Sequence, residues 1–121
     1  MKENLLINLS KEFAVDIVNL CTNIKETKKS NPLVNQLLRS GTSIGANIHE
    51  ANYASSIYDF INKMQIALKE CYETDYWLDL FNKTNIIQED VYRSMYSDCC
   101  RIRRILTATI NTSKKKLEAK L

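Results

Sequence analysis

The sequence contains few of the residues that interrupt helices. Among its 121 residues there are only two glycines and one proline. These residues form tight turns, so a fold with many short strands and turns is excluded, and a few long helices are favoured. A chain of this length usually has a single core. We expect residues 1–121 to form one domain, with an ordered core over about 10–112 and a basic C-terminal tail over 113–121.

Long apolar segments are also missing. No stretch approaches the roughly 20 apolar residues that a transmembrane helix needs. The amino terminus lacks a charged leader followed by an apolar run and a cleavage site. We therefore expect a cytoplasmic protein that does not cross a membrane.

Histidine occurs once, at His49, which limits the metal chemistry. Di-iron carboxylate bundles need Glu-x-x-His on two helices, and zinc peptidases need HExxH, so neither site can be formed. The cysteines form no CxxC pair and are expected to be reduced thiols in the core. They are Cys21, Cys71, Cys99 and Cys100. We expect no metal and no cofactor.

Patterns typical of other catalytic sites are absent as well. Ser40 and Ser43 precede His49 on a predicted helix, not on the strained turn of a nucleophile elbow. No glycine-rich phosphate loop is present. Glu70 and Glu73 could act as acid and base, but such carboxylates on an amphipathic helix are more often ion-pair partners. We expect no enzyme activity and no small-molecule substrate.

Apolar residues at steps of three and four predict the first two helices. One starts near Ser10 and ends with lysines, because cations are favoured in a last turn: Lys25, Lys28 and Lys29. Its inward residues are Phe13, Ile17, Leu20 and Ile24. The next starts with Asn31 as N-cap before Pro32 and reaches about Tyr53. Its inward residues are Val34, Leu37, Gly41, Ile44, Ile48 and Ala51.

Both glycines, Gly41 and Gly45, lie inside the second predicted helix, four residues apart and therefore on one side. Each glycine costs about 1 kcal/mol relative to alanine in a helix interior, so another interaction must offset that cost. Small residues four apart recur where two helix backbones approach closely. We expect a close helix contact at these two positions.

The third predicted helix is the longest. Ser56 and Asp59 resemble a capping box at its start, and it ends near Lys83 with Asn85 as a left-handed stop. Its inward residues are Ile57, Ile61, Met64, Leu68, Cys71 and Leu78. Residues 76–81 are apolar nearly all round, whereas one bundle core covers only one side of a helix. We expect an interface with another subunit, formed by Tyr76, Trp77, Leu80 and Phe81.

The fourth predicted helix starts near Gln88, with Glu89 and Asp90 in its first turn, and frays into a lysine-rich tail. Its inward residues are Val91, Met95, Cys99, Ile102, Leu106 and Thr109. Four helices with short connections predict an all-α fold, an antiparallel up-down-up-down four-helix bundle.

The charges are unevenly distributed. A net charge of +3 is too small to identify a nucleic-acid-binding protein, but acidic residues dominate 56–82 and basic residues dominate 99–121. Candidate phosphate contacts are Arg101, Arg103, Arg104, Lys114, Lys115 and Lys116. For the lysines, a solvated and frayed terminus is the alternative interpretation.

Two segments carry a resemblance to a known family. They are LLRSGTSIGANIHEA at 37–51 and FINKMQIALKECYETDYWL at 60–78. Both resemble the four-helix-bundle proteins encoded by intervening sequences of bacterial large-subunit ribosomal RNA genes, and the similarity extends to accessory variability proteins of diversity-generating retroelements. The resemblance implies a bacterial homopentamer with a basic, nucleic-acid-binding surface and, in the retroelement branch, a reverse transcriptase as partner.

Four polar residues match the family motif in the second helix, and their spacing of four, four and three places them on one side. They are Arg39, Ser43, Asn47 and Glu50. We expect them to meet Lys69, Glu70 or Glu73 of the third helix. A structural network that fixes helix register is favoured over a binding pocket, because buried polar groups require partners.

Two functional hypotheses follow. The first is a non-enzymatic, homo-oligomeric protein that binds RNA or DNA through its basic fourth helix, without sequence specificity, or serves as an accessory protein. The second is a protein-interaction scaffold that binds no nucleic acid, in which the basic helix pairs with the acidic third helix of a neighbour.

Overall fold

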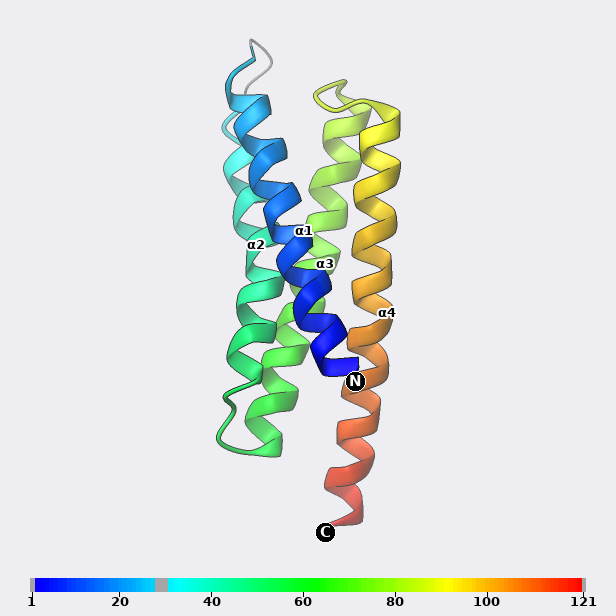
Figure 1. The fold of residues 1–121 in the computed structure, drawn as a ribbon. Coiled ribbons are helices and arrows are strands. Elements are labelled where there is room, and N and C mark those ends of the chain that lie inside the picture. Colours follow the sequence, from blue (N-terminus) through cyan, green and yellow to red (C-terminus); the bar gives the residue numbers. More distant parts are fainter. Residues whose placement is uncertain (1, 28–30, 121) are drawn as a thin grey trace.

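Four α-helices account for most of the chain in the computed structural model, which describes residues 2–27 and 31–120. They are α1 (Lys2–Lys25), α2 (Val34–Ala51), α3 (Ile57–Lys83) and α4 (Glu89–Ala119). Successive helices run in opposite directions, and each packs against its neighbours around one core (Figure 1). This confirms the predicted antiparallel up-down-up-down bundle. In the part of the chain that the structure describes, no helix is apolar over a length that could span a bilayer.

The core is formed by the apolar stripes that the sequence pattern predicts. All six inward residues predicted for α2 are buried, from Val34 to Ala51. In α3 the predicted residues Ile57 and Leu68 are only partly buried and flank the core, while Ala67 and Phe81 are fully covered. The stripe of α3 is therefore wider than the sequence pattern indicated.

The prediction that the first helix starts near Ser10 is wrong, because α1 already begins at Lys2. Ser10 lies inside the helix, where its hydroxyl donates to the Ile7 carbonyl oxygen at 3.1 Å and its exposed fraction is 1%. Leu6, one turn earlier, is fully buried and belongs to the core. Three lysines were predicted in the last turn of this helix. Lys25 is the last residue of α1, while Lys28 and Lys29 lie outside the described residues.

The predicted end signals of α2 and α3 are close to the observed ones. Asn31 Oδ1 accepts a hydrogen bond from the Leu33 N–H at 2.9 Å, but a turn intervenes before α2 begins at Val34. Ser56 Oγ accepts from the Asp59 N–H at 3.0 Å and caps α3. After α3, Asn85 has a φ of 61°, as expected of a left-handed stop.

The glycines of α2 face α1. A Cβ atom on Gly41 would lie 2.7 Å from Ile17 Cγ1, and one on Gly45 would lie 3.2 Å from the carbonyl oxygen of Ser10. At Gly45 the neighbour is backbone, whereas at Gly41 it is a side chain. The absence of both Cβ atoms lets α1 pack directly on α2.

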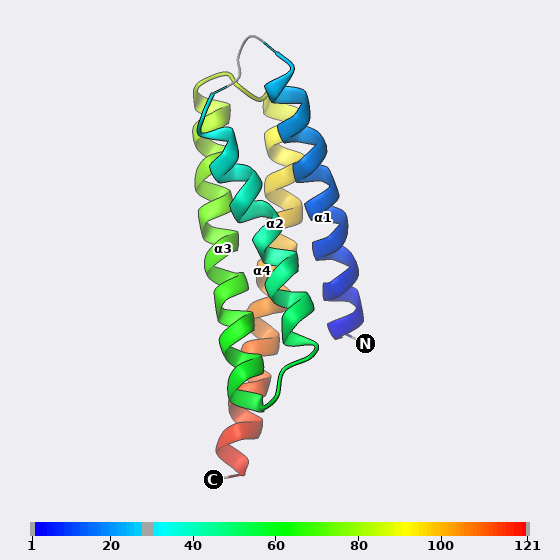
Figure 2. The same ribbon diagram turned by 90° about the vertical axis from the view of Figure 1, so that its left-hand side faces the viewer.

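The lysine-rich segment does not fray, contrary to the prediction. α4 continues through it to Ala119, because Ile110, Ser113 and Leu117 extend the inward stripe: Ile110 and Ser113 are buried, and Leu117 packs against the core. The end of α4 projects beyond the N-terminal end of α1 and beyond the connection between α2 and α3 (Figures 1 and 2). Lys114, Lys115 and Lys116 are therefore presented on a helix.

Candidate functional surfaces

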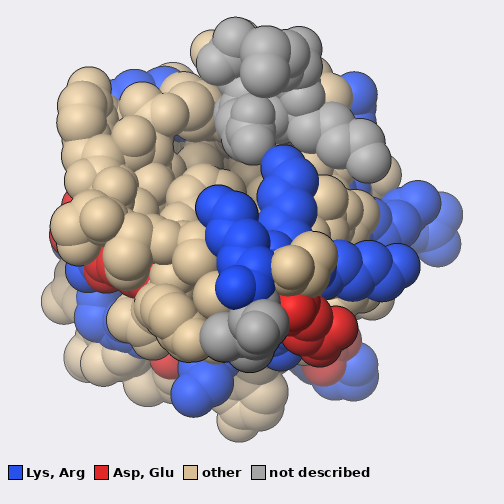
Figure 3. Space-filling model, turned by 90° about the horizontal axis from the view of Figure 1, so that it is seen from below, with Lys and Arg blue, Asp and Glu red and all other residues tan. Residues whose placement is uncertain are grey.

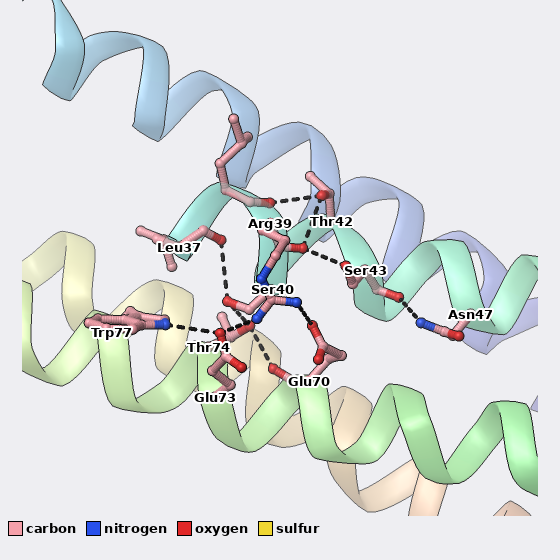
Figure 4. Close-up of polar contacts among 11 residues, drawn as sticks. Leu37, Arg39, Ser40, Thr42, Ser43, Asn47, Glu70, Glu73, Thr74 and Trp77 are labelled. Carbon is pink, nitrogen blue, oxygen red and sulfur yellow. Dashed lines mark hydrogen bonds and ion pairs between the residues drawn. The ribbon is translucent and has the colours of Figure 1, made fainter. Parts of the chain in front are cut away.

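Arg39 of α2 forms ion pairs with two carboxylates of α3 (Figure 4). Its guanidinium donates to Glu70 Oε2 at 3.0 Å and to Glu73 Oε2, and Glu73 Oε2 also accepts from Trp77 Nε1 at 3.1 Å. Burial alone raises the pKa of Glu73, but the hydrogen bonds from Trp77 and Arg39, with the Arg39 charge, lower it below its ordinary value. This cluster links α2 to α3.

Beneath the ion pairs, two hydroxyl residues meet inside the core. Thr74 Oγ1 and Ser40 Oγ are 3.1 Å apart, and both residues are 0% exposed. The single Thr74 O–H can donate either to Ser40 Oγ or to the Glu70 carbonyl oxygen, which is 2.7 Å away, and the Ser40 O–H donates to the Leu37 carbonyl oxygen. Neither residue was predicted as part of the network. The sequence could have indicated the burial of Ser40, because this residue follows Leu37 by three positions and so lies on the same buried side of the helix.

The other motif residues of α2 are arranged differently from the expectation. Ser43 Oγ donates to the Arg39 carbonyl and Asn47 Nδ2 to the Ser43 carbonyl, at 2.6 and 2.8 Å, so both bond within α2 (Figure 4). Glu50 pairs with Lys63 rather than with Lys69, Glu70 or Glu73. Lys69 is exposed and takes no part in the hydrogen bonds and ion pairs of this cluster. The network is thus smaller than expected and centred on Arg39.

Arg103, one of the predicted phosphate contacts, is engaged within the bundle, so a phosphate would have to compete with an ion pair of the same chain. It pairs with Asp75 of α3, donates to Cys100 Sγ at 3.1 Å, and lies 5.0 Å from the centre of the Tyr72 ring. The side chains of Arg103 and Asp75 are 21% and 13% exposed. Burial raises the pKa of Asp75 despite the charge of Arg103 and its hydrogen bond to Oδ2, and Asp75 Oδ1 is buried without a hydrogen-bond partner among the described residues. This pair joins α3 to α4.

All four cysteines are free and buried, as expected. Burial raises the pKa of the Cys21 thiol to about 11, against the opposing effect of Lys25. A hydrogen bond with Cys71, together with burial, holds the pKa of Cys99 far above its ordinary value. The raised pKa values of Cys21 and Cys99 keep these two thiols protonated at neutral pH, which makes them poor nucleophiles. Within 2–27 and 31–120, no group of three His, Cys, Asp or Glu side chains is placed to hold a metal ion.

The other five basic residues of α4 predicted to contact phosphates are exposed: Arg101, Arg104, Lys114, Lys115 and Lys116. Figure 3 views the bundle from the end at which α4 terminates, and Lys and Arg side chains project from this end. None of the described residues forms an ion pair with these five cations. Arg101 nevertheless lines a hollow together with Glu12, Asp16 and Asp98, so its charge is partly opposed.

The bundle itself covers most of the aromatic run in α3. Phe81 is 0% exposed and belongs to the core of the single chain, which corrects its assignment to a subunit interface. Trp77 and Leu80 are partly buried, and Trp77 packs against Tyr76 and Phe81. Tyr76 is 60% exposed. The surface left for a second subunit is thus centred on Tyr76.

Comparison with protein families gives a match that covers most of the chain. Residues 2–108 match the family described as 23S rRNA-intervening sequence protein. The chain belongs to this family. The matched range contains the Arg39 cluster, both glycines and the Asp75–Arg103 pair, but it stops before Lys114–Lys116. The polar contacts between helices therefore lie within the family region, and the lysine-rich end of α4 lies outside it.

A solved structure supports the same relationship. The chain is similar to a protein of unknown function from the S23 ribosomal protein family of Bacteroides thetaiotaomicron, with 48% identity and a TM-score of 0.89. The similarity covers 92% of this chain and 99% of that chain. No curated protein matches the chain. The comparisons thus give the family and the fold of the chain. Its activity has to be inferred from the surface residues described above.

Proposed function

We propose that this 23S rRNA-intervening sequence protein is a non-enzymatic, homo-oligomeric protein that binds nucleic acid through the basic end of α4. The observation that carries the proposal is the helical presentation of Lys114, Lys115 and Lys116. They are consecutive and exposed, and among the described residues no carboxylate pairs with them. A rigid helix that holds three unpaired cations offers a polyanion a preformed set of contacts.

Arg104 extends the same surface towards the bundle. It is exposed and lies eleven residues before Lys115, which is about three helical turns, so the two side chains leave α4 on the same side. Lysine and arginine contacts to phosphates release condensed counterions, and this gives affinity without sequence specificity. The sequence carries no RNA-recognition motif or zinc finger, so we expect any selectivity to come from nucleic-acid shape or from a protein partner.

Self-assembly forms the second half of the proposal. The exposed Tyr76 supplies an aromatic anchor for an interface, since Tyr contributes large apolar area with a polar tip. In the homopentamer that the sequence resemblance implies, five basic helix ends would act together and raise the avidity for a polyanion. A reverse transcriptase is the protein partner that the resemblance adds to this proposal.

The binding half is tested by titrating the full chain against structured RNA and duplex DNA at low salt. Changing Lys114, Lys115 and Lys116 together to Gln should weaken binding to both polyanions by tenfold or more. A matched control removes three exposed lysines elsewhere, with Lys11, Lys25 and Lys69 changed to Gln, and should bind like the parent. Arg103 is kept in all variants because it supports the fold. A parent that binds neither polyanion, or a test variant that binds like the control, overturns the proposal.

The scaffold alternative finds less support in the structure. It requires the basic helix of one chain to meet free carboxylates on α3 of another. Four of the five carboxylates of α3 are already engaged by cations of the same chain: Glu70 and Glu73 by Arg39, Asp75 by Arg103, and Asp79 by Lys83. The fifth, Asp59, lies in the first turn of the helix and accepts a hydrogen bond from the Ser55 N–H. An acidic docking surface therefore has to be sought elsewhere.

A further inference from the structure

Unpaired carboxylates gather where α1 meets α4. Glu12 and Asp16 lie on α1, and Asp90 and Asp98 lie on α4. All four are exposed, and within 2–27 and 31–120 no cation forms an ion pair with any of them. Arg101 is the one cation lining the same hollows in the described part of the chain. We call these four carboxylates the acidic seam.

The acidic seam borders a continuous groove. Three hollows of about 150, 430 and 470 Å³ follow one another along α1, from the middle of α4 to the connection between α3 and α4. The first two share Asp16, and the last two share Leu20 and Val91. α1 and α4 are the most loosely packed of the neighbouring helix pairs. In Figure 1, α1 crosses the bundle obliquely, so its axis is not parallel to that of α4. The groove thus widens towards the connection between α3 and α4.

The walls of the groove are partly apolar. Leu9 and Leu20 of α1 and Val91 of α4 are only partly covered by their own chain and pack on the core from the groove side. Apolar surface between rows of charged residues is typical of grooves that accept a helix. The unpaired carboxylates select for a helix that carries cations.

The chain itself contains such a helix, but it cannot reach its own seam. Lys114 follows Asp98 by sixteen residues on the same helix, which places the two residues about 24 Å apart at a rise of 1.5 Å per residue. Lys114, Lys115 and Lys116 and the carboxylates of α4 can therefore meet only between two chains. The two charged segments are also similar in length, since Asp90 to Asp98 spans about 12 Å of helix and Lys114 to Lys120 about 9 Å.

We propose that the acidic seam of one copy binds the lysine-rich end of α4 of a second copy. This proposal rests on the self-assembly half of the proposed function, and it adds a charged contact between copies to the aromatic one centred on Tyr76. The contact is heterologous, because the surfaces differ, so it closes into a ring or continues as a chain of subunits. Since the same lysines are proposed to bind phosphates, nucleic acid and the seam compete for them.

The experiment measures the mass of the full chain by light scattering in three charge-reversed variants. The seam variant changes Glu12, Asp16 and Asp98 to Lys, and the tail variant changes Lys114, Lys115 and Lys116 to Glu. The combined variant carries both sets and has the parent's formal net charge of +3. All six residues are exposed, so folding should be preserved. A control variant reverses Lys11, Lys25 and Lys69 instead.

Docking at the acidic seam predicts that the seam and tail variants each lose the parent's oligomeric mass at low salt. The combined variant, and an equal mixture of the two single-set variants, should regain it, because both restore opposite charges across the interface. The control should keep it. An oligomer that survives both single-set reversals uses another face and overturns docking at the seam while leaving self-assembly intact. If the unmodified protein has a mass of 14.0 kDa, both docking at the seam and self-assembly are wrong. The proposed nucleic-acid binding is then still tested separately by the titration.

Discussion

The side chain of Ile17 on α1 fills the space that a Cβ atom on Gly41 of α2 would occupy. Such an atom would lie 2.7 Å from Ile17 Cγ1 and 2.9 Å from both Cγ2 and Cδ1, closer than real Cβ contacts. Ile17 is 0% exposed and cannot move into solvent. The glycine is therefore required by its partner across the helix interface, and its cost within α2 is offset there.

Gly41→Ala is expected to destabilise the fold. Overpacking typically costs about 1 to 3 kcal/mol, and alanine recovers about 1 kcal/mol of helix propensity. We expect a net loss of about 1 kcal/mol in the free energy of unfolding, measured by urea denaturation. Leucine at Gly41 or Gly45 should separate α1 from α2 and disrupt folding.

The control for this prediction is a double-mutant cycle with Ile17→Ala. That change alone should cost about 2 to 5 kcal/mol, because it leaves a cavity between α1 and α2. In its presence Gly41→Ala should be neutral or stabilising, since the new methyl group enters the cavity. Equal losses from Gly41→Ala in both backgrounds would show that Ile17 is not the residue that requires the glycine.

Substitutions of Arg101, Arg103 and Arg104 in α4 should differ in their effect on stability. Arg103→Gln breaks the partly buried pair with Asp75, and we expect a loss of about 3 kcal/mol, at the low end for a buried ion pair. Arg101→Gln and Arg104→Gln change exposed residues and should stay within about 0.5 kcal/mol of the parent. Urea denaturation of the three variants decides the point. A similar loss in all three would mean that the Asp75 pair has no special role.

The apolar pattern was sufficient to predict four helices and most of the core, because core residues repeat at the helical period. The start of α1 was missed because Ser10 resembles an N-cap, whereas in the folded chain it faces Gly45 from inside the helix. The end of α4 was missed because three lysines suggested a solvated terminus. The buried side of that segment, formed by Ser113 and Leu117, carries little apolar character and gave a weak signal.

Stability should depend on pH through Glu73. Its pKa is lowered in the folded chain from an ordinary value of 4.5, so its ion pair contributes stability above that pH, and the contribution is lost as the pH falls through the folded value. Solvent screening limits the effect to no more than about 1 kcal/mol, because the Arg39 side chain is 49% exposed. Glu73→Gln should therefore be less stable than the parent at pH 7, and the difference should shrink below pH 4.5. Urea denaturation at both pH values measures it, and a difference that grows in acid would contradict the assignment.

Self-assembly through the aromatic surface predicts that Tyr76→Asp shifts association to higher protein concentration. The change puts a charge on a residue that is 60% exposed in the single chain, so the fold should be unaffected while burial in an interface becomes costly. Light scattering over a concentration series measures the shift. Tyr53→Asp, on another exposed aromatic, serves as the control. Identical curves for Tyr76→Asp and the parent would remove Tyr76 from the interface.

The candidate surfaces were only partly predictable, because a sequence does not reveal which side chains meet across helices. Arg101, Arg103 and Arg104 look equivalent in the chain, yet only Arg103 meets a carboxylate of α3. A signal existed, since position 103 lies between the buried Cys99 and Leu106 at steps of four and three. The acidic seam had no such signal, because Glu12 and Asp98 are brought together only by the bundle.

The most direct measurement of the central claim is the salt dependence of nucleic-acid binding. The logarithm of the binding constant for duplex DNA should fall linearly with the logarithm of salt concentration, with a slope of about 0.9 for each phosphate bound. Changing Lys114, Lys115 and Lys116 to Gln should flatten that slope by about one unit for each phosphate that the variant no longer binds, while changing Lys11, Lys25 and Lys69 to Gln should leave it unchanged. Equal slopes for the two triple variants would contradict binding through the end of α4.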